Sequence, residues 1–561
     1  MSTPTHPTTV ARLLVETLEV NGVERVFLVP GESYLAVIDA LADSPIATVV
    51  ARHESGAAIM AEATAKLTGR PGIAMVTRAP GATNAFAGLH VAEHDGTPMI
   101  LFVGQIDRGF RERGAFQEMD YGRVFGSVAK WVAVIDDPER MVEMVGRAFS
   151  VATAGRPGPV VVVLPEDVLG EAATARDVRP AVATETHPGL HQMWDLQKRL
   201  WAAERPLVIL GGSRWSETAV RRFARFAEAF DLPVACSFRR QMLFDHLDPH
   251  YAGDVGIGLN PALRARIDRA DLILLIGGRL AEVPSQGYTL LDIPVPKQSL
   301  VHVHPSAEEL GRVYRPDLAI HATPAAFAAA AEALQPPPAG IRWADWTAAA
   351  HADYLAWSED LPATPGAVQM GAVIAALRAC LPEDAILTNG AGNYATWIHR
   401  FWRFRRFATQ VAPTSGSMGY GLPAAIAAKL AHPDRPVICF AGDGCFQMTS
   451  QELATAVQAD ARIVVLVVDN GIYGTIRMHQ EREFPARVHA TTLANPDFAA
   501  LARAHGALGL TVSTADEIVP ALTAALAADR PALVHLKVSP EAITPTTTLT
   551  ALRAAALAKP R

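Results

Sequence analysis

The sequence predicts an α/β protein built from three doubly wound domains, each with a parallel sheet. Along the whole chain, short runs of apolar and β-branched residues alternate with longer alanine- and leucine-rich stretches, often with a glycine between them. This alternation indicates β-α-β units, which form parallel sheets. The runs are nearly continuous in apolar residues, as expected for strands that are buried on both faces. A chain of 561 residues, half of them apolar, should also divide into about three or four domains.

The expected strands fall into three groups along the chain. They are residues 25–30, 47–51, 73–77, 99–103 and 159–164 in the first third, 206–210, 272–276 and 300–303 in the middle third, and 385–388, 437–440, 463–468 and 533–538 in the last third. Two polar, proline-containing stretches have the composition of linkers: 174–188, and 335–340 running on to 364–366. They predict an N-terminal domain at 1–180, a middle domain at 190–335 and a C-terminal domain at 365–545.

Charge and composition argue against several classes of partner. The formal net charge is −7 and no block of lysine and arginine occurs, so we expect no nucleic acid partner. The first residues lack a basic segment followed by an apolar one, and no stretch approaches the ~18 apolar residues of a membrane span. We therefore expect no membrane association and a cytoplasmic location. Four widely spaced cysteines, without a CxxC pair, favour neither a zinc site nor a disulfide framework.

Oxygen ligands follow two expected strands of the last third. Asp443 comes directly after one strand, between Gly442 and Gly444, and Asn470 follows the next strand, with the Ile472 carbonyl two residues later. The carboxyl ends of parallel strands share one edge of a sheet, so these three oxygens should converge. Mg²⁺ takes such ligands and fills its remaining positions with phosphate and water. An isolated GDG is usually only a turn, but the pair predicts a magnesium and diphosphate site.

This pair of motifs, GDG at 442–444 and DNGIYG at 469–474, resembles the signature of thiamine diphosphate enzymes. Two other segments, RHESGA at 52–57 and APGATN at 79–84, resemble further motifs of that family. The resemblance implies that Glu54 hydrogen-bonds N1′ of the cofactor's aminopyrimidine and that Met418 supports the bent cofactor. It implies cofactor contacts for Gly390, Gly392, Asn393, Gly416, Met418, Gly442, Gly444, Cys445, Tyr473 and Gly474.

The resemblance covers the whole chain. It implies a pyrimidine-binding N-terminal domain, a Rossmann-like middle domain and a diphosphate-binding C-terminal domain, in the order found in 2-oxoacid decarboxylases and acetolactate synthases. It further implies a homodimer or a dimer of dimers, with each cofactor between two chains. The segment GAFQEM at 114–119 resembles the synthase branch, so Phe116 and Gln117 are expected to flank a small 2-oxoacid substrate.

Several positions depart from the synthase pattern. Glu166 stands where the synthases usually have a lysine, and His479 stands where they have a tryptophan that favours a larger second 2-oxoacid. Glu32 replaces a small residue and is similar to an acidic residue of the decarboxylases. The synthases hold FAD near a segment containing FDDR, whereas residues 277–283 read GGRLAEV, so the sequence does not support FAD although it leaves it open.

The function predicted from these residues is decarboxylation of a 2-oxoacid, dependent on thiamine diphosphate and Mg²⁺, with attack of the resulting enamine on a second carbonyl, as in acetolactate synthase. A 2-oxoacid decarboxylase or a 2-hydroxyacyl C–C lyase of the same family is the alternative. Residues 390–395 (GAGNYA) also match a dinucleotide fingerprint, which leaves an NAD(P)-dependent dehydrogenase as a remote alternative. The last alternative is a non-catalytic binding protein that retains the fold.

Overall fold

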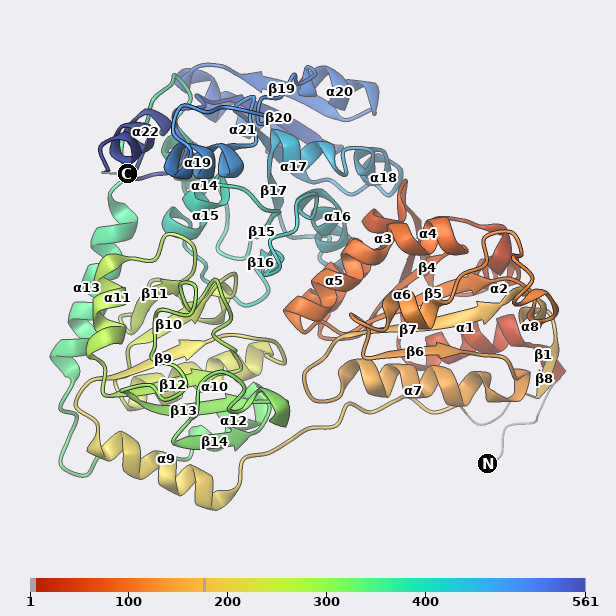
Figure 1. Cartoon of the computed structure of the whole chain (residues 1–561), viewed down its shortest axis with the longest axis horizontal. Coiled ribbons are helices and arrows are strands. Elements are labelled where there is room, and N and C mark those ends of the chain that lie inside the picture. Colours follow the sequence, from red (N-terminus) through yellow and green to blue (C-terminus); the bar gives the residue numbers. More distant parts are fainter. Residues whose placement is uncertain (1–6, 175–177, 560–561) are drawn as a thin grey trace. The chain divides into compact units, whose positions relative to one another are not determined.

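The computed structural model describes residues 7–174 and 178–559 and contains three six-stranded parallel sheets (Figure 1). Helices lie on both sides of each sheet, so the predicted fold class is confirmed. The chain forms two compact units by its internal contacts. One comprises residues 1–184 with 426–431 and 451–459, and the other comprises the remainder. The domain boundaries at 180, 190, 335, 365 and 545 stay predictions.

The first unit contains the first sheet, with strand order β3-β2-β4-β5-β7-β6. Its strands are β2 (Arg25–Leu28), β3 (Ala47–Val50), β4 (Gly72–Val76), β5 (Met99–Gln105), β6 (Trp131–Val134) and β7 (Pro159–Pro165). One face is covered by α1 (Val10–Val20), α2 (Leu35–Ala42) and α7 (Met141–Thr153), and the other by α3 (Glu54–Thr68) and α5 (Phe86–Asp95). The strands β1 (Pro7–Thr9) and β8 (Ala172–Thr174) form a two-stranded antiparallel ribbon, which pairs the segment before α1 with the segment after α8 (Glu166–Leu169).

The second sheet has the order β11-β10-β9-β12-β13-β14. Its strands are β9 (Pro206–Leu210), β10 (Val234–Ser237), β11 (Tyr251–Val255), β12 (Leu272–Ile276), β13 (Ser299–His304) and β14 (Leu318–His321). Its helices are α9 (Leu190–Ala202), α10 (Glu217–Ala229), α11 (Pro261–Arg269), α12 (Pro324–Ala331) and α13 (Ala344–Glu359).

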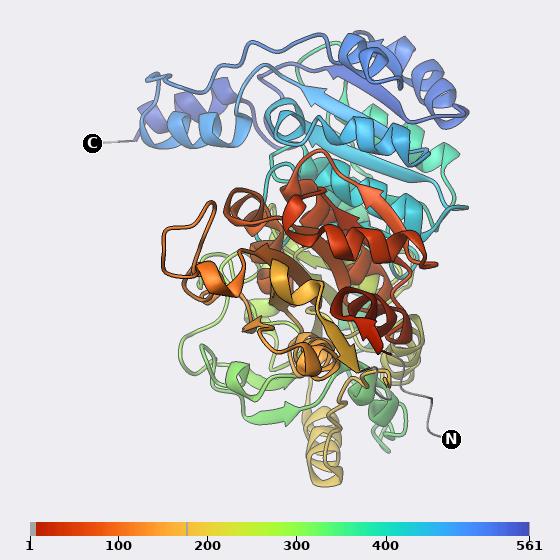
Figure 2. The ribbon, with the colours of Figure 1, turned by 90° about the vertical axis from the view of Figure 1, so that its right-hand side faces the viewer.

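The third sheet has the order β16-β15-β17-β18-β20-β19, and its cyan and blue helices lie on both sides of it in Figure 2. Its strands are β15 (Ile386–Asn389), β16 (Gln410–Val411), β17 (Val437–Gly442), β18 (Val464–Asp469), β19 (Leu508–Val512) and β20 (Ala532–Lys537). The helices of this part of the chain are α14 (Met370–Cys380), α15 (Ala395–Phe401), α16 (Gly421–Ala431), α17 (Asp443–Gln447), α18 (Glu452–Gln458), α19 (Gly474–Glu483), α20 (Phe498–Ala504), α21 (Ile518–Leu526) and α22 (Leu549–Leu557).

Short helical turns occupy several of the loops. They are α4 (Ala79–Asn84), α6 (Tyr121–Phe125), α8 (Glu166–Leu169), η1 (Glu32–Tyr34), η2 (Arg108–Phe110), η3 (Pro138–Arg140), η4 (Gln241–Leu243), η5 (Ala307–Glu309) and η6 (Ala515–Glu517). No helix in the described part of the chain has the length and apolar character needed to span a bilayer.

Every expected strand overlaps an observed one, but β1, β8 and six strands of the three six-stranded sheets were not expected. Five of these six, β6, β11, β14, β16 and β19, are edge strands. Of these, β14 alternates between buried and exposed residues, so it lacks the continuous apolar run that marks an interior strand. The sixth, β10, is fully buried, but its sequence VACS contains small residues instead of a β-branched run.

The second predicted linker is wrong in its central part. Residues 344–359 form the helix α13, which packs against β11 and α11. Its Tyr354 is 5% exposed, contacts the ring of Tyr251 at a centroid distance of 4.6 Å, and shares a 3.2 Å hydrogen bond with His246 Nδ1. The prolines that flank this segment suggested a linker, although they only bracket a helix. The first linker, 174–188, includes residues 175–177, which lie outside the described residues.

Replacement of Tyr354 tests whether α13 belongs to a core. Tyr354→Ala should destabilise the second unit by about 3–5 kcal/mol, because it leaves a cavity and removes the Tyr354 partner of His246 Nδ1. Tyr354→Phe should cost less, since the ring stays. Thermal unfolding of both variants measures this, with Ala349→Gln on the exposed side of α13 as the control. A Tyr354→Ala protein as stable as this control would show that the helix does not contribute to a core.

Candidate active site

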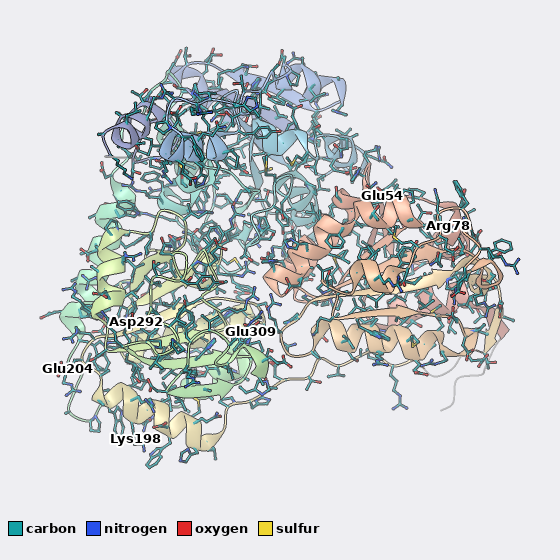
Figure 3. The ribbon with its side chains drawn as sticks, in the orientation of Figure 1. Glu54, Arg78, Lys198, Glu204, Asp292 and Glu309 are labelled. Atoms are coloured by element: carbon teal, nitrogen blue, oxygen red, sulfur yellow. The ribbon has the colours of Figure 1, made fainter. Side chains whose placement is uncertain are left out.

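In the first unit, the fold brings the RHESGA and APGATN segments together around Glu54 (Figure 3). Glu54 is the first residue of α3 and is 9% exposed. The amide nitrogen of Asn84, at the end of α4, donates a 2.9 Å hydrogen bond to Glu54 Oε2. Gly81 lies so close that a Cβ there would stand 2.9 Å from Glu54 Oε1. The two motifs therefore fix the position of one buried carboxyl group.

The two glutamates that depart from the synthase pattern in this unit contact the same arginine. Arg78 follows β4 (Figure 3) and pairs with Glu166, which follows β7. A second guanidinium nitrogen of Arg78 lies 3.9 Å from the carboxylate of Glu32, which follows β2. The sequence analysis treated the two glutamates as separate features and missed Arg78. Three strand ends thus form one charged cluster at the edge of the sheet that also carries Glu54.

Phe116 and Gln117 lie in the loop between β5 and β6 of the first unit. The side chain of Phe116 is 72% exposed. Gln117 has a φ of 62°, and its carbonyl accepts a 3.5 Å hydrogen bond from the backbone nitrogen of Ala79, next to Arg78. The loop is therefore hydrogen-bonded to the APGATN segment, while the side chain of Phe116 is exposed in the single chain. Their role beside a substrate stays a prediction.

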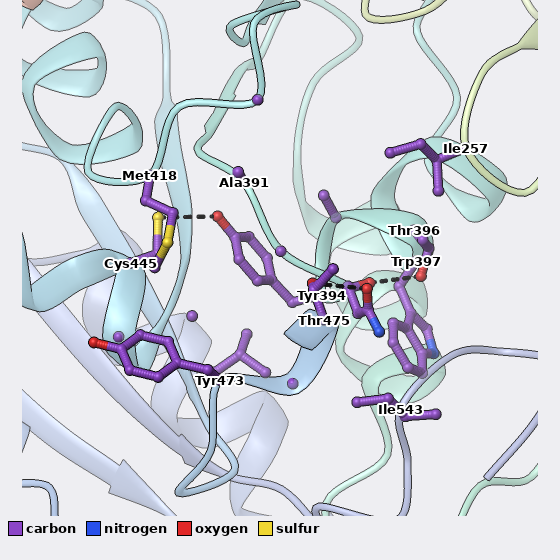
Figure 4. Close-up of a pocket in the computed structure, with 18 of the residues that line it drawn as sticks. Ile257, Ala391, Tyr394, Thr396, Trp397, Met418, Cys445, Tyr473, Thr475 and Ile543 are labelled. Atoms are coloured by element: carbon purple, nitrogen blue, oxygen red, sulfur yellow. Dashed lines mark hydrogen bonds between the residues drawn. The ribbon is translucent and has the colours of Figure 1, made fainter. Parts of the chain in front are cut away.

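The second unit contains a cavity of about 360 Å³ at the carboxyl ends of β15, β17 and β18 (Figure 4). Twelve of the thirteen residues predicted for the metal and diphosphate site line it: Gly392, Asn393, Gly416, Met418, Gly442, Asp443, Gly444, Cys445, Asn470, Ile472, Tyr473 and Gly474. The thirteenth, Gly390, precedes Ala391, which also lines the cavity. The convergence that was expected of Asp443, Asn470 and the Ile472 carbonyl is therefore present, while the binding roles of all these residues stay predictions.

Two glycines of this cavity have no room for a side chain. A Cβ at Gly444 would lie 2.6 Å from the ring of Tyr473, and a Cβ at Gly392, where φ is 150°, would lie 2.7 Å from the ring of Tyr394. The hydroxyl of Tyr394 donates to Cys445 Sγ over 3.4 Å, which holds this ring in place (Figure 4). A side chain at either position would therefore displace a tyrosine ring that lines the cavity, so the two glycines preserve the shape of the cavity.

Asp443 is a buried carboxylate held by three nitrogen donors. Its Oδ1 accepts from the backbone of Gly444 at 2.9 Å, and its Oδ2 accepts from the backbone of Gly471 at 2.9 Å and from Asn495 Nδ2 at 2.7 Å. Burial, reinforced by the charge of Asp469, raises the pKa of Asp443 to about 6. A bound cation would favour the ionised form. Together with Asn470 and the Ile472 carbonyl, this carboxylate fits the oxygen donors that Mg²⁺ prefers.

Asn495 was missed by sequence reasoning. Its side-chain nitrogen donates both to Asp443 and to Asp469 Oδ1, the latter over 2.8 Å. Burial opposes ionisation of Asp469, but hydrogen bonds from His535 and Lys537 outweigh it and lower its pKa. Asn495 therefore bridges the two carboxylates and helps to orient Asp443. It lies in a loop before α20, outside any recognisable motif, so nothing in the sequence marked it.

Family models match three regions of the chain. Residues 8–124 match the thiamine pyrophosphate enzyme N-terminal TPP-binding domain, residues 195–331 match the central domain, and residues 390–536 match the C-terminal TPP-binding domain. Thiamine pyrophosphate is another name for thiamine diphosphate. The residues matched by each family model contain strands of a different one of the three six-stranded sheets.

Relatives match along nearly the whole chain. An acetolactate synthase of Mycobacterium bovis is 30% identical over 548 residues, which are 95% of this chain and 88% of that protein. The chain belongs to the thiamine pyrophosphate enzyme family. The acetolactate synthase isozyme 2 large subunit of Escherichia coli is 29% identical over 530 residues (94% and 95%), and an acetolactate synthase of Bacillus subtilis is 27% identical over 536 residues (94% and 93%).

In this thiamine pyrophosphate enzyme, the second sheet also contributes to the cavity. Arg239, in the loop after β10, has a φ of 57° and is 3% exposed. Its Nη2 donates to the Gly390 carbonyl over 2.8 Å, and its Nη1 donates to the carbonyl of Pro413. These bonds connect the loop after β10 to both sides of the diphosphate-binding segments. Sequence reasoning missed Arg239 because β10 itself was not expected.

A metal ion bound at this edge of the third sheet would have one carboxylate ligand, that of Asp443. Within residues 7–174 and 178–559, no cluster of three or more histidine, cysteine or acidic side chains is suited to a metal ion. The set of Asp443, Asn470 and the Ile472 carbonyl leaves three octahedral positions for phosphate and water. This arrangement fits a cation that is bound together with a diphosphate.

Removal of the Asp443 carboxylate tests the metal site. Asp443→Ala should weaken binding of thiamine diphosphate in the presence of Mg²⁺ by at least about 100-fold, because the cation loses its charged ligand. Calorimetric titration of the dialysed protein measures this, and Asp529→Ala, at an exposed carboxylate, is the control. Retention of both Mg²⁺ and cofactor by the Asp443 variant would refute the site.

The pKa of Asp443 predicts a pH dependence of the cofactor-free, metal-free protein. A raised pKa means that the folded state binds the proton more tightly than the unfolded state, so the contribution of this group to stability falls as pH rises from about 4 to about 6. Asp443→Asn is neutral at every pH. Its melting temperature relative to the unchanged protein should therefore rise by about 1–3 °C across this interval and then level off. A difference that does not depend on pH would contradict the burial of this charge.

Proposed function

We propose that this enzyme uses thiamine diphosphate and Mg²⁺ to decarboxylate a small 2-oxoacid and joins the remaining acyl unit to a second carbonyl compound, as acetolactate synthases do. The observation that carries the proposal is the cavity in which twelve predicted metal and diphosphate residues meet. Similarity of 27–30% to proteins named acetolactate synthases, over 94–95% of the chain, supports the choice of reaction. The proposal does not require FAD.

Each part of the site has a defined role in this proposal. Bound thiamine diphosphate supplies a nucleophilic carbon and an electron sink. The carboxyl group of Glu54 holds a proton at the cofactor's N1′, and Asn84 fixes the orientation of that carboxyl group. Asp443, Asn470 and the Ile472 carbonyl bind Mg²⁺, and Met418 supports the cofactor from below. Phe116 and Gln117 flank the substrate.

We also propose that the active enzyme is a homodimer or a dimer of dimers, with Glu54 of one chain and Asp443 of another serving one cofactor. The 72% exposure of Phe116 supports this arrangement, since a large aromatic side chain in a substrate-binding loop is expected to be covered. Light scattering of the purified protein determines the mass of the assembly.

A decarboxylase or C–C lyase is the second candidate, and the charged cluster around Arg78 favours it. Where the synthases have a lysine and a small residue, this chain has Glu166 and Glu32, both beside Arg78. This changes the charges that surround the substrate. The early steps of the reaction need only the cofactor site, which both candidates share.

The deciding experiment is incubation of the purified protein with pyruvate, with and without thiamine diphosphate and Mg²⁺, followed by identification of the products. Acetolactate that forms only with both cofactors is the expected result. Free acetaldehyde would favour the decarboxylase. Binding of thiamine diphosphate without turnover of pyruvate would retain the family but refute pyruvate as the donor.

Glu54→Gln tests the role of the buried carboxyl group. The substitution keeps the size of the side chain but removes the carboxyl proton, so turnover should fall by at least about 100-fold while thiamine diphosphate still binds. Rate measurements and cofactor titration separate the two effects. Glu16→Gln, at an exposed position on α1, is the control. Full activity of the Glu54 variant would eliminate Glu54 as the activating residue.

A further inference from the structure

Asn495 is a side-chain amide that is held at both ends beside Asp443. Its Nδ2 donates to Asp443 Oδ2 over 2.7 Å and to Asp469 Oδ1 over 2.8 Å. Its Oδ1 accepts a 3.1 Å hydrogen bond from Gln447 Nε2. Because ionised carboxylates only accept hydrogen bonds, the nitrogen of the amide has to face the two acids. The orientation of the Asn495 side chain is therefore fixed.

The carboxylate of Asp469, which holds one N–H of this amide, is itself anchored. His535 Nε2 donates a 2.7 Å hydrogen bond to Asp469 Oδ2, and Lys537 Nζ donates to the same oxygen over 3.0 Å. Both donors lie on β20, which pairs directly with β18, and His535 is 1% exposed. Hydrogen bonds to an ionised acceptor are stronger than those between neutral groups. Asn495 is thus bound to a group that the neighbouring strand keeps in place.

The hydrogen bonds to Asp443 leave room for a cation on only one of its oxygens. An ionised carboxylate offers about four lone-pair positions, two on each oxygen. Among the described residues, the backbone of Gly444 fills one position of Oδ1, while the backbone of Gly471 and the amide of Asn495 fill both positions of Oδ2. The remaining position is on Oδ1. A cation that binds here therefore receives one oxygen of this carboxylate and not both.

Coordination by one carboxylate oxygen suits Mg²⁺ better than Ca²⁺. Mg²⁺ demands a near-ideal octahedron at about 2.0–2.1 Å, with one or two carboxylates and with phosphate and water in the other positions. Ca²⁺ takes about six to eight oxygens at about 2.3–2.6 Å in a flexible geometry, often from both oxygens of a carboxylate. Asn495 blocks the second mode because it occupies Oδ2 of Asp443.

We propose that Asn495 is a positioning residue that makes the metal site selective for Mg²⁺ over the larger Ca²⁺, because it restricts Asp443 to coordination through one oxygen. Asp469 contributes through Asn495. This inference rests on the proposed function, which assigns Mg²⁺ to Asp443, and it adds the origin of the cation preference. Without the amide, Oδ2 is free to join Oδ1 in contact with a larger cation.

Asn495→Leu tests the proposal, because leucine is similar in size but has no hydrogen-bonding group. Calorimetric titration of the dialysed protein with MgCl₂ or CaCl₂, in the presence of thiamine diphosphate, gives the dissociation constant of each cation. The unchanged protein should bind Mg²⁺ at least about tenfold more tightly than Ca²⁺. In the variant, the constant for Mg²⁺ should rise by about 10–100-fold and that for Ca²⁺ by less than about threefold. Equal losses for both cations, no loss, or an unchanged protein that does not discriminate would overturn the proposal.

Two further variants separate selectivity from a structural role. Gln447→Ala, at an exposed position, removes only the donor to Asn495 Oδ1, so it should reduce the preference for Mg²⁺ by less than Asn495→Leu does. Asn21→Leu is the matched control. Asn21 is a half-buried amide of the first unit that donates to the Thr17 carbonyl over 2.7 Å and accepts from the backbone nitrogen of Ala181 over 2.8 Å. This control should keep the preference, and a control that loses it as Asn495→Leu does would refute a specific role of Asn495.

The titration also distinguishes failure of the inference from failure of the proposed function, because cation binding does not require turnover. If the protein binds thiamine diphosphate and Mg²⁺ but does not convert pyruvate, the proposed reaction is wrong, and the two dissociation constants still decide the role of Asn495. If the unchanged protein binds neither cation in the presence of thiamine diphosphate, the metal site and this inference are both wrong.

Discussion

The site in the second unit depends on the placement of one carboxylate, that of Asp443, at the end of a central parallel strand. Burial makes its ionisation costly, and three nitrogen donors hold it in position. Because β15, β17 and β18 run parallel, their following loops meet at one edge of the sheet. The segments after β17 and β18 supply the donors to this carboxylate, and the loop after β15 lines the cavity beside it. The glycines, the tyrosine rings and Asn495 all follow from the need to keep one buried charge accessible to a cation and a phosphate.

The loop after β10 extends this arrangement into the second sheet. Arg239 gives its hydrogen bonds to backbone carbonyls of the diphosphate-binding segments. It is one of several links between the second and third sheets, since Met242, which follows β10, packs in the core of the third sheet. Burial lowers the pKa of His399, a residue of α15 that lines the cavity, and the charge of Arg239 adds to this effect. The middle region of the chain therefore affects the chemistry of the cavity without supplying any of the predicted cofactor ligands.

Residues could be placed from the sequence where they directly follow a recognisable strand. Asp443 and Asn470 could be placed because each directly follows an apolar strand, and strand ends converge in a parallel sheet. Asn495, Arg78 and Arg239 could not be found in this way, because their roles arise only from tertiary contacts. The helix α13 was mistaken for a linker because its flanking prolines were given more weight than its length.

The cluster around Arg78 makes the identities of three distant positions interdependent. Glu32, Arg78 and Glu166 are far apart in the sequence but share one guanidinium group. A lysine introduced at position 166, as in the synthases that the chain resembles, would place two cations side by side and leave Arg78 only the more distant carboxylate of Glu32. The effects of substitutions here should thus be epistatic, since neighbouring charges do not contribute additively. A change in the charges at this edge of the sheet would therefore require replacements at two or three of these positions together.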